Sequence, residues 1–161
     1  MQLYRYSPIA NEQVLHEAIA YVAEASSALC RQVVGEVFPI TSLTVFAHYP
    51  SESICLKKLL LTMGEQVGNT NGPRVALHAP INLGSHTITH LRVREPDPYH
   101  AQVGCVDLNV PDYDLFKRDF LATHPNNLRL LVRPEYELIE LFDPDADVLG
   151  YVLSEPERST R

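Results

Sequence analysis

The chain of 161 residues lacks the features that mark several large classes of protein. Its three cysteines stand at unrelated spacings, so they form neither a disulfide framework nor a Cys-x-x-Cys pair. No apolar run approaches the roughly 20 residues that span a bilayer. The N-terminus has no basic segment followed by an apolar one, as a signal peptide would. These absences predict a protein of the reducing cytoplasm with no membrane partner.

A surplus of basic charge is also missing. The formal net charge is −7 at pH 7, while the charged content of 20% and the apolar content of 45% are ordinary for a globular protein. Such a balance argues against a dedicated polyphosphate binder, so nucleic acid is not expected as a partner. The glycines punctuate turns and complete neither G-x-x-x-x-G-K-S/T nor G-x-G-x-x-G, the two common phosphate-binding motifs.

The hydrophobic pattern that is present predicts an α+β protein that begins with a long helix. Asn11 is a helix-capping residue, and the helix should end near Val34, where Gly35 follows. Apolar residues fall on one broad stripe of this helix, so it should pack against another surface. Two surfaces suit it: a sheet of the same chain, or a second copy in a homodimer.

The rest of the chain contains the same order of elements twice. The first set is strand 41–49, helix 50–63, strand 73–81 and strand 86–94, with an extra short strand near 66–70. The second set is strand 103–110, helix 111–124 and strands 128–133, 136–142 and 148–154. A repeat of about 60 residues is typical of a duplicated α+β module. The predicted units are a helical extension (1–39), a first βαβββ-like module (40–102), a second βαβββ module (103–154) and a tail (155–161).

Two motifs of the second module give the chain a family resemblance. Its opening, C-V-D-L-N-V-P-D (105–112), is similar to the "H-V-x-L-x-V-x-D" start of modules in the vicinal-oxygen-chelate superfamily of glyoxalases and extradiol dioxygenases. The stretch D-P-D-A-D (143–147) is similar to that superfamily's "D-P-D-G-N" turn. Within the superfamily, residues 71–99 resemble the middle of the YecM-type proteins. The resemblance implies two paired βαβββ modules that form a half-open barrel.

The same resemblance implies that the usual metal ligands are absent. The superfamily holds its metal with a His on the first strand of each module and a Glu on a last strand. At the matching positions this chain has Ser42, Cys105 and Gly150. Serine and glycine do not hold a catalytic divalent ion, and one thiolate does not hold it alone. The resemblance therefore implies the barrel without the chelated metal, and no cofactor is expected.

Strand alternation predicts which side chains line the cleft of such a barrel. The predicted cleft face consists of Thr44, Phe46, His48, His86, His90, Arg92, Arg94, Cys105, Asp107, Asn109, Arg129 and Arg133, with Tyr136, Leu138 and Glu140 preferred over their neighbours on the same strand. Arg92 and Arg94 stand one step apart on the same side of a strand, where two guanidinium groups suit a carboxylate or a phosphate.

A small anionic ligand is the function that these residues favour. Its predicted binding residues are His90, Arg92, Arg94, Arg129, Arg133, Tyr136 and Cys105. Asp107 and Glu140 are the candidates for a general base, if the protein is an enzyme, and this point is left open. The competing interpretation is a structural network in which the arginines pair with nearby acidic residues.

Two other functions are compatible with the sequence. A divalent transition metal held by relocated ligands, with His48, His90 and Glu140 as a facial triad, would support a lyase, isomerase or oxygenase. A non-enzymatic interaction module would use the N-terminal helix for dimerisation. The D-x-D-x-D spacing of residues 143–147 is not a third candidate, because it lacks the glycine and the distal glutamate of a calcium loop. It is predicted to be a turn whose Asp side chains bond their own backbone.

Overall fold

The computed structural model describes residues 4–97 and 99–155. Its elements are α1 (Glu12–Val34), β1 (Ile40–Phe46), α2 (Pro50–Met63), β2 (Gly64–Gly68), β3 (Arg74–Leu83), β4 (His86–Arg94), β5 (Gly104–Leu108), α3 (Tyr113–Phe116), a π-helical stretch η1 (Lys117–Leu121), β6 (Leu128–Val132), β7 (Glu137–Leu141) and β8 (Val148–Leu153). The predicted α+β class and the repeated order of strand, helix and three strands are both present.

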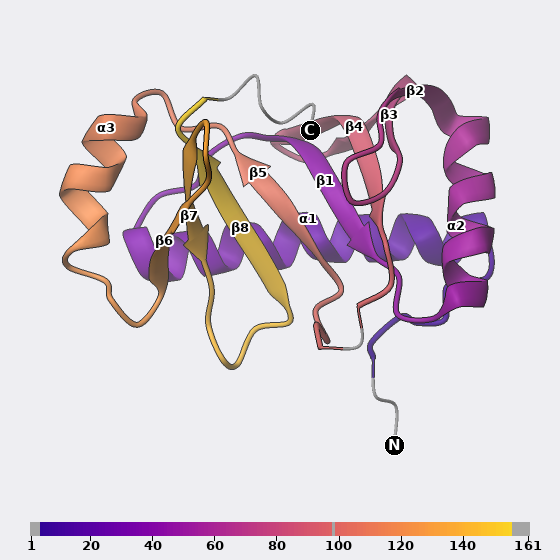
Figure 1. The fold of residues 1–161 in the computed structure, drawn as a ribbon, viewed down its shortest axis with the longest axis horizontal. Coiled ribbons are helices and arrows are strands. Elements are labelled where there is room, and N and C mark those ends of the chain that lie inside the picture. The colour runs from indigo at the N-terminus through magenta and orange to yellow at the C-terminus, as the bar shows by residue number, and fades with distance from the viewer. Residues whose placement is uncertain (1–3, 98, 156–161) are drawn as a thin grey trace.

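One curved sheet of eight strands unites the two modules, in the order β2-β3-β4-β1-β5-β8-β7-β6. Each module contributes four neighbouring strands, and β1 pairs with β5 in antiparallel fashion where the modules meet. Within each module the first strand is parallel to the last, as in β1 with β4 and β5 with β8. The two paired βαβββ modules form a half-open barrel (Figure 1).

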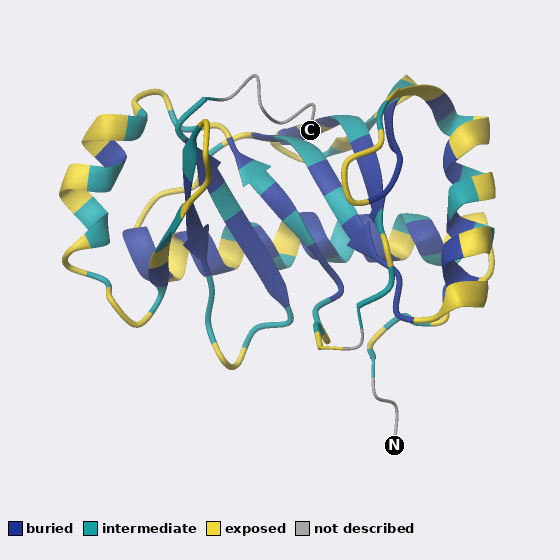
Figure 2. Cartoon of the chain, in the orientation of Figure 1, coloured by how far each residue is buried: buried dark blue, intermediate teal, exposed yellow. Residues whose placement is uncertain are grey.

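Helix α1 lies along one face of this sheet and supplies much of the core. The Asn11 side chain accepts a hydrogen bond from the Val14 N–H at 2.9 Å, and Gly35 ends the helix with φ of 78°, a conformation that favours glycine. Leu15, Ile19 and Val22 of the buried stripe are fully enclosed. Figure 1 shows the helix running behind the strands, and Figure 2 shows buried residues recurring along it. The helix therefore covers the sheet of its own chain.

Strand β4 departs from the strict alternation that its sequence predicts. Its pairing with β3 is shifted between Ala76 and Ile81, where β3 carries extra residues. Beside this shift, Ile88 and Leu91 of β4 both lie in the core although they are three residues apart. Two consecutive residues, Thr89 and His90, separate them, so the alternation of β4 changes phase at this point. The N-terminal end of β4 is thus out of phase with its C-terminal end, which carries the arginines.

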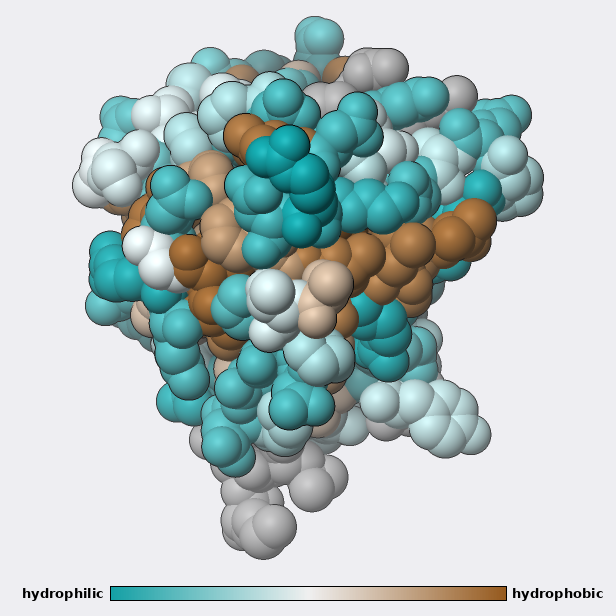
Figure 3. Space-filling model, turned by 90° about the vertical axis from the view of Figure 1, so that its left-hand side faces the viewer, coloured by the Kyte–Doolittle hydropathy of each residue, from teal (hydrophilic) through white to brown (hydrophobic). Residues whose placement is uncertain are grey.

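The second module is also more irregular than its pattern predicts. The helix expected over 111–124 is a short α3 followed by η1. The turn at 143–147 forms as predicted, because the Asp145 N–H donates to the Asp143 carboxylate at 2.8 Å. At this end of the molecule, Leu115 and Val132 are exposed, and Figure 3 shows apolar side chains in a band there.

In the part of the chain that the structure describes, no helix is long and apolar enough to cross a membrane.

Candidate ligand-binding site

A cavity of about 390 Å³ lies on the face of the sheet opposite α1, which we call the open face. Its lining comes from both modules: Thr44, Phe46, Asn71, Arg92, Arg94, His100, Cys105, Asp107, Leu131, Arg133, Tyr136, Leu138, Glu140 and Tyr151. We call it the arginine cavity. Its volume is within the range of small-molecule sites.

Strand β4 brings two arginines to one wall of the arginine cavity. Register with β1 sets Arg92 beside Thr44 and Arg94 beside Phe46. The Arg94 guanidinium carbon lies 4.6 Å from the centre of the Phe46 ring, which orients the group by a cation–π contact. Its Nη2 is 3.7 Å from the Asp97 carboxylate, and its buried Nε has no hydrogen-bond acceptor among the described residues. Arg94 therefore keeps donor capacity for another group.

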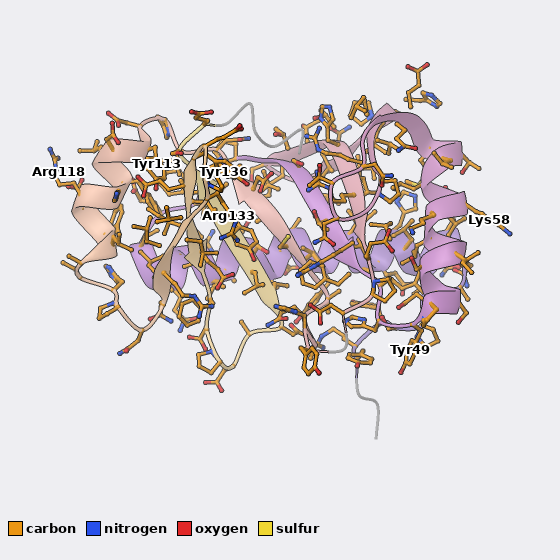
Figure 4. All side chains as sticks on the ribbon, viewed as in Figure 1. Tyr49, Lys58, Tyr113, Arg118, Arg133 and Tyr136 are labelled. Carbon is orange, nitrogen blue, oxygen red and sulfur yellow. The ribbon has the colours of Figure 1, made fainter. Side chains whose placement is uncertain are left out.

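The opposite wall comes from the connection between β6 and β7. Arg133 is exposed, and Tyr136 is half-buried beside it. Both line the arginine cavity. Figure 4 shows the two side chains over the part of the sheet formed by β7 and β8, whereas Arg118 points away from the molecule at the far side of α3. The cavity is thus bordered by arginines on two sides.

A hydrogen-bonded group of three residues forms part of the cavity floor. The Tyr151 hydroxyl donates to one oxygen of Glu140 at 2.9 Å, and Arg129 donates to the other oxygen. Burial is the main cause that raises the pKa of Tyr151, and the nearby Cys105 and Glu140 raise it further. The Tyr151 hydroxyl therefore stays protonated. Because both Glu140 oxygens accept hydrogen bonds, Glu140 is arranged to hold Arg129 and Tyr151 in position. Its role as a general base stays a prediction.

The segment between the modules closes one end of the cavity. His100 Nδ1 lies 2.6 Å from the Asp97 carboxylate, which also faces Arg94. The hydrogen bond from the Tyr99 N–H has the largest effect on the Asp97 carboxyl and lowers its pKa. His100 and Arg94 lower this pKa further. The carboxylate is therefore ionised at neutral pH and positions both a histidine and an arginine at the cavity.

A second cavity of about 270 Å³ adjoins the first on the open face. It is lined by Thr41, Ser42, Arg74, Thr89, His90, Asp107, Leu108, Asn109, Val110, Val152 and Leu153, and we call it the His90 cavity. Asp107 belongs to both linings. Burial, and to a smaller extent the positive charge of Arg74, lowers the pKa of His90. The imidazole is therefore neutral at pH 7.

The structure brings together most of the residues that the sequence predicted for the site. Arg92, Arg94, Arg133, Tyr136, Cys105, Asp107 and Glu140 line the arginine cavity. His90 lies in the adjoining His90 cavity, and Arg129 is outside both linings, where it pairs with Glu140. Sequence reasoning missed His100 and Tyr151. Alternation along β8, which sets Tyr151 between the core-facing Gly150 and Val152, is the sequence signal that could have found the tyrosine, whereas His100 follows no regular pattern.

Two histidines predicted for the cleft lie elsewhere. His48 stacks on Tyr4 with ring centres 3.9 Å apart, and its Nε2 donates to the Gln102 carbonyl at 3.0 Å. His86 lies on the α1 side of the sheet, with Nε2 2.7 Å from the Ser27 hydroxyl. The first prediction failed because β1 ends at Phe46, and the second because β4 changes phase.

The structure does not bring together the three residues of the alternative metal site. His48 contacts the N-terminal segment, His90 lies in the His90 cavity, and Glu140 lies in the arginine cavity. Within residues 4–97 and 99–155, no group of three or more His, Cys, Asp or Glu is placed to hold a metal ion. Gly150, which the resemblance sets at the last-strand ligand position, does not face the cavity. A Cβ on Gly150 would point at Leu108, so Gly150 faces the core and Tyr151 is the β8 residue that faces the cavity.

Buried histidines make the stability of the fold depend on pH. Burial lowers the pKa of His48, His86 and His90 below the value of about 6.5 that applies to the unfolded chain. The unfolded state therefore binds more protons below that pH. The free energy of unfolding should fall between about pH 7.5 and pH 5.5, by up to about 1.4 kcal/mol per pH unit for each fully linked proton.

Urea denaturation at several pH values measures this slope. His86 is the clearest case, because its Nδ1 accepts the Ile40 N–H at 3.1 Å and cannot do so when protonated. We expect His86→Gln to flatten the slope within the same pH window, whatever its effect on stability at pH 7.5. If the free energy of unfolding of His86→Gln depended on pH as steeply as that of the unmutated protein, His86 would not be a source of this pH dependence.

The fold and the cavities define an α+β protein of two paired βαβββ modules with a ligand-sized cavity on the open face. No protein-family model matches the chain, and neither does any curated protein. A solved structure described as "Structural Genomics, Protein EC4020" is similar to it, with a TM-score of 0.67 and 12% sequence identity over 99% of this chain and 97% of that one. At this identity the likeness shows a shared fold.

Proposed function

We propose that the arginine cavity binds a small organic or inorganic anion. The observation that carries the proposal is that Arg92, Arg94 and Arg133 border one cavity of about 390 Å³ from two sides. The chain as a whole has a net charge of −7, so this grouping of positive charge runs against the average of the molecule. Charge-assisted hydrogen bonds from guanidinium groups are among the strongest contacts available to a carboxylate or phosphate.

The competing interpretation, a structural network in which the arginines pair with acidic residues of the chain, accounts for only part of the positive charge at the cavity. Glu140 is engaged by Arg129 and Tyr151, and Arg94 meets Asp97 only at 3.7 Å. The buried Arg94 Nε, which meets no acceptor within the described ranges, supports a ligand over an internal partner. The acceptors of this chain thus leave the Arg94 guanidinium incompletely paired, and because Arg94 lines the cavity, an anion there would supply a further acceptor to the group.

The proposal keeps the resemblance to the vicinal-oxygen-chelate superfamily as an account of the fold, without the chelated metal. Ser42 and Cys105 occupy the expected ligand positions and lie in different cavities. A thiol and a hydroxyl so placed do not form a divalent-metal site. Whether the anion is only bound or also converted depends on Asp107 and Glu140, which keep their predicted catalytic roles as part of this proposal.

Calorimetric titration at low salt tests the proposal with inorganic phosphate and succinate as probes. We expect at least one probe to bind and to raise the melting temperature. Arg94→Gln should weaken its binding by about tenfold or more, because one charge-assisted hydrogen bond is lost. Arg118→Gln is the matched control, since Arg118 is an exposed arginine at the far end of the molecule.

Two results would overturn the proposed anion site. One is the absence of binding by both probes at low salt. The other is an equal loss of binding in Arg94→Gln and Arg118→Gln, which would indicate a general effect of charge. Circular dichroism of each variant separates a loss of binding from a loss of fold.

The compartment and the partners belong to the same proposal. Cys30, Cys55 and Cys105 form no disulfide within residues 4–97 and 99–155, which supports the reducing cytoplasm. The homodimer stays a prediction. Helix α1, which the sequence suggested for that contact, buries its apolar stripe against the sheet of its own chain.

A further inference from the structure

The two cavities of the open face lie in series along the same strands. On β1, Ser42 lines the His90 cavity and Thr44 lines the arginine cavity. On β4, His90 and Arg92 are divided in the same way, and each pairs with the corresponding β1 residue. Same-face residues on one strand are about 7 Å apart. The cavities are therefore neighbouring parts of one trough, and Asp107 lines both of them.

The chemistry of this trough changes along its length. The arginine cavity presents guanidinium groups at its walls. Asp107, at the junction, presents a carboxylate that accepts hydrogen bonds. Beyond it, the His90 cavity is mixed: Ser42, Arg74 and His90 line it together with the apolar Val110 and Leu153, while the neighbouring Leu108 and Val152 belong to the core. A ligand that fills the trough therefore meets guanidinium donors first, an acceptor next, and last a mixed cavity with apolar side chains on one side.

Building on the proposed anion site, we propose that the trough binds an α-amino or α-hydroxy acid with an apolar side chain. Its carboxylate lies against Arg92 and Arg94. The ammonium or hydroxyl group on the adjoining carbon donates to Asp107. The side chain then enters the His90 cavity, where it contacts Val110, Leu153 and the His90 ring.

This order of groups excludes simpler anions as the best ligands. An inorganic phosphate satisfies the arginines but leaves the His90 cavity unfilled. A plain carboxylic acid of the same length sets carbon against the Asp107 carboxylate, where a hydrogen-bond donor is favoured. The α-substituent is therefore the feature that should distinguish ligands at this site.

Calorimetric titration of the full chain with five probes tests the inference: L-leucine, 2-hydroxy-4-methylpentanoate, 4-methylpentanoate, glycine and inorganic phosphate. We expect leucine or the hydroxy acid to bind about tenfold or more tightly than 4-methylpentanoate, which lacks only the donor. We also expect leucine to bind more tightly than glycine, because only leucine fills the His90 cavity.

Two variants assign these preferences to the trough. Asp107→Asn should remove most of the preference for leucine over 4-methylpentanoate, since the negative charge that favours an ammonium group is lost. Val110→Phe should reduce leucine binding to the level of glycine, by filling the His90 cavity. Asp114→Asn and Val67→Phe are the matched controls, because both residues are exposed and outside both linings.

The outcomes separate the inference from the anion site on which it depends. If phosphate binds and leucine is no better than 4-methylpentanoate, the trough inference is wrong and the anion site stands. If none of the five probes binds, both proposals fail. If Asp107→Asn leaves the leucine preference intact while the protein stays folded, Asp107 is not the acceptor and the inference is wrong.

Discussion

Replacing Glu52 by alanine is expected to lower the free energy of unfolding by about 3–5 kcal/mol. Glu52 is fully buried on the first turn of α2. One carboxylate oxygen accepts the Ile9 N–H and the other accepts the His48 N–H, both at 2.6 Å. Alanine would leave both of these buried backbone donors without an acceptor.

The position of Glu52 explains how a buried carboxylate is tolerated. It lies at the N-terminus of α2, where the exposed N–H groups and the helix dipole favour a negative charge. The contact with the Ile9 N–H ties the N-terminal segment to the β1–α2 connection. His48, in that connection, also lies 2.6 Å from the Ser7 hydroxyl. The carboxylate therefore serves the fold and not the cavities.

Urea denaturation checks this prediction with two further variants. Glu52→Gln keeps one acceptor oxygen in place and should recover part of the lost stability. Glu65→Ala is the control, because Glu65 is exposed on the edge strand β2 and such surface changes are usually within about 0.5 kcal/mol. A loss below about 1 kcal/mol for Glu52→Ala would show that water replaces the carboxylate at the two N–H groups.

Gly104→Ala is expected to cost about 3 kcal/mol or more, although it adds a single methyl group. A Cβ at Gly104 would lie 2.2 Å from the Thr44 carbonyl oxygen and 3.1 Å from Val22 of α1. The first contact is with backbone, so no change of side-chain rotamer relieves it. Gly104 pairs with Val45 where β5 meets β1, and the two modules would have to separate locally to admit the methyl group.

Gly84→Ala is the matched control for this effect. Its Cβ would meet nothing within 4 Å, but its φ of 64° is unfavourable for alanine, so a loss of about 1 kcal/mol is expected. Thermal and urea unfolding of both variants give the comparison. Equal losses at the two positions would mean that backbone conformation, and not the contact between the modules, explains the role of Gly104.

The helical limits and much of the sheet follow from local sequence. Asn11 and Gly35 set the ends of α1 through their own caps, so no distant residue is needed to predict them. Alternation in the first strand of the second module correctly separates Cys105 and Asp107 from the core residue Val106. The period of two fixes the faces of a regular strand, which explains why most cavity-lining residues could be predicted.

The tertiary structure decided the features that depend on pairing between strands. The shift between β3 and β4 placed His86 against α1, and no count along the sequence reveals it. The two acceptor bonds of Glu52 join residues that are far apart in the chain, so its sequence indicates only a helix start. The division of the open face into two cavities that share Asp107 likewise comes from the packing of both modules.

Sequence alone determined the elements and the faces of the regular strands, because these depend on neighbouring residues. The burial, the partners and the grouping of side chains depend on contacts between distant parts of the chain, which only the folded sheet brings together.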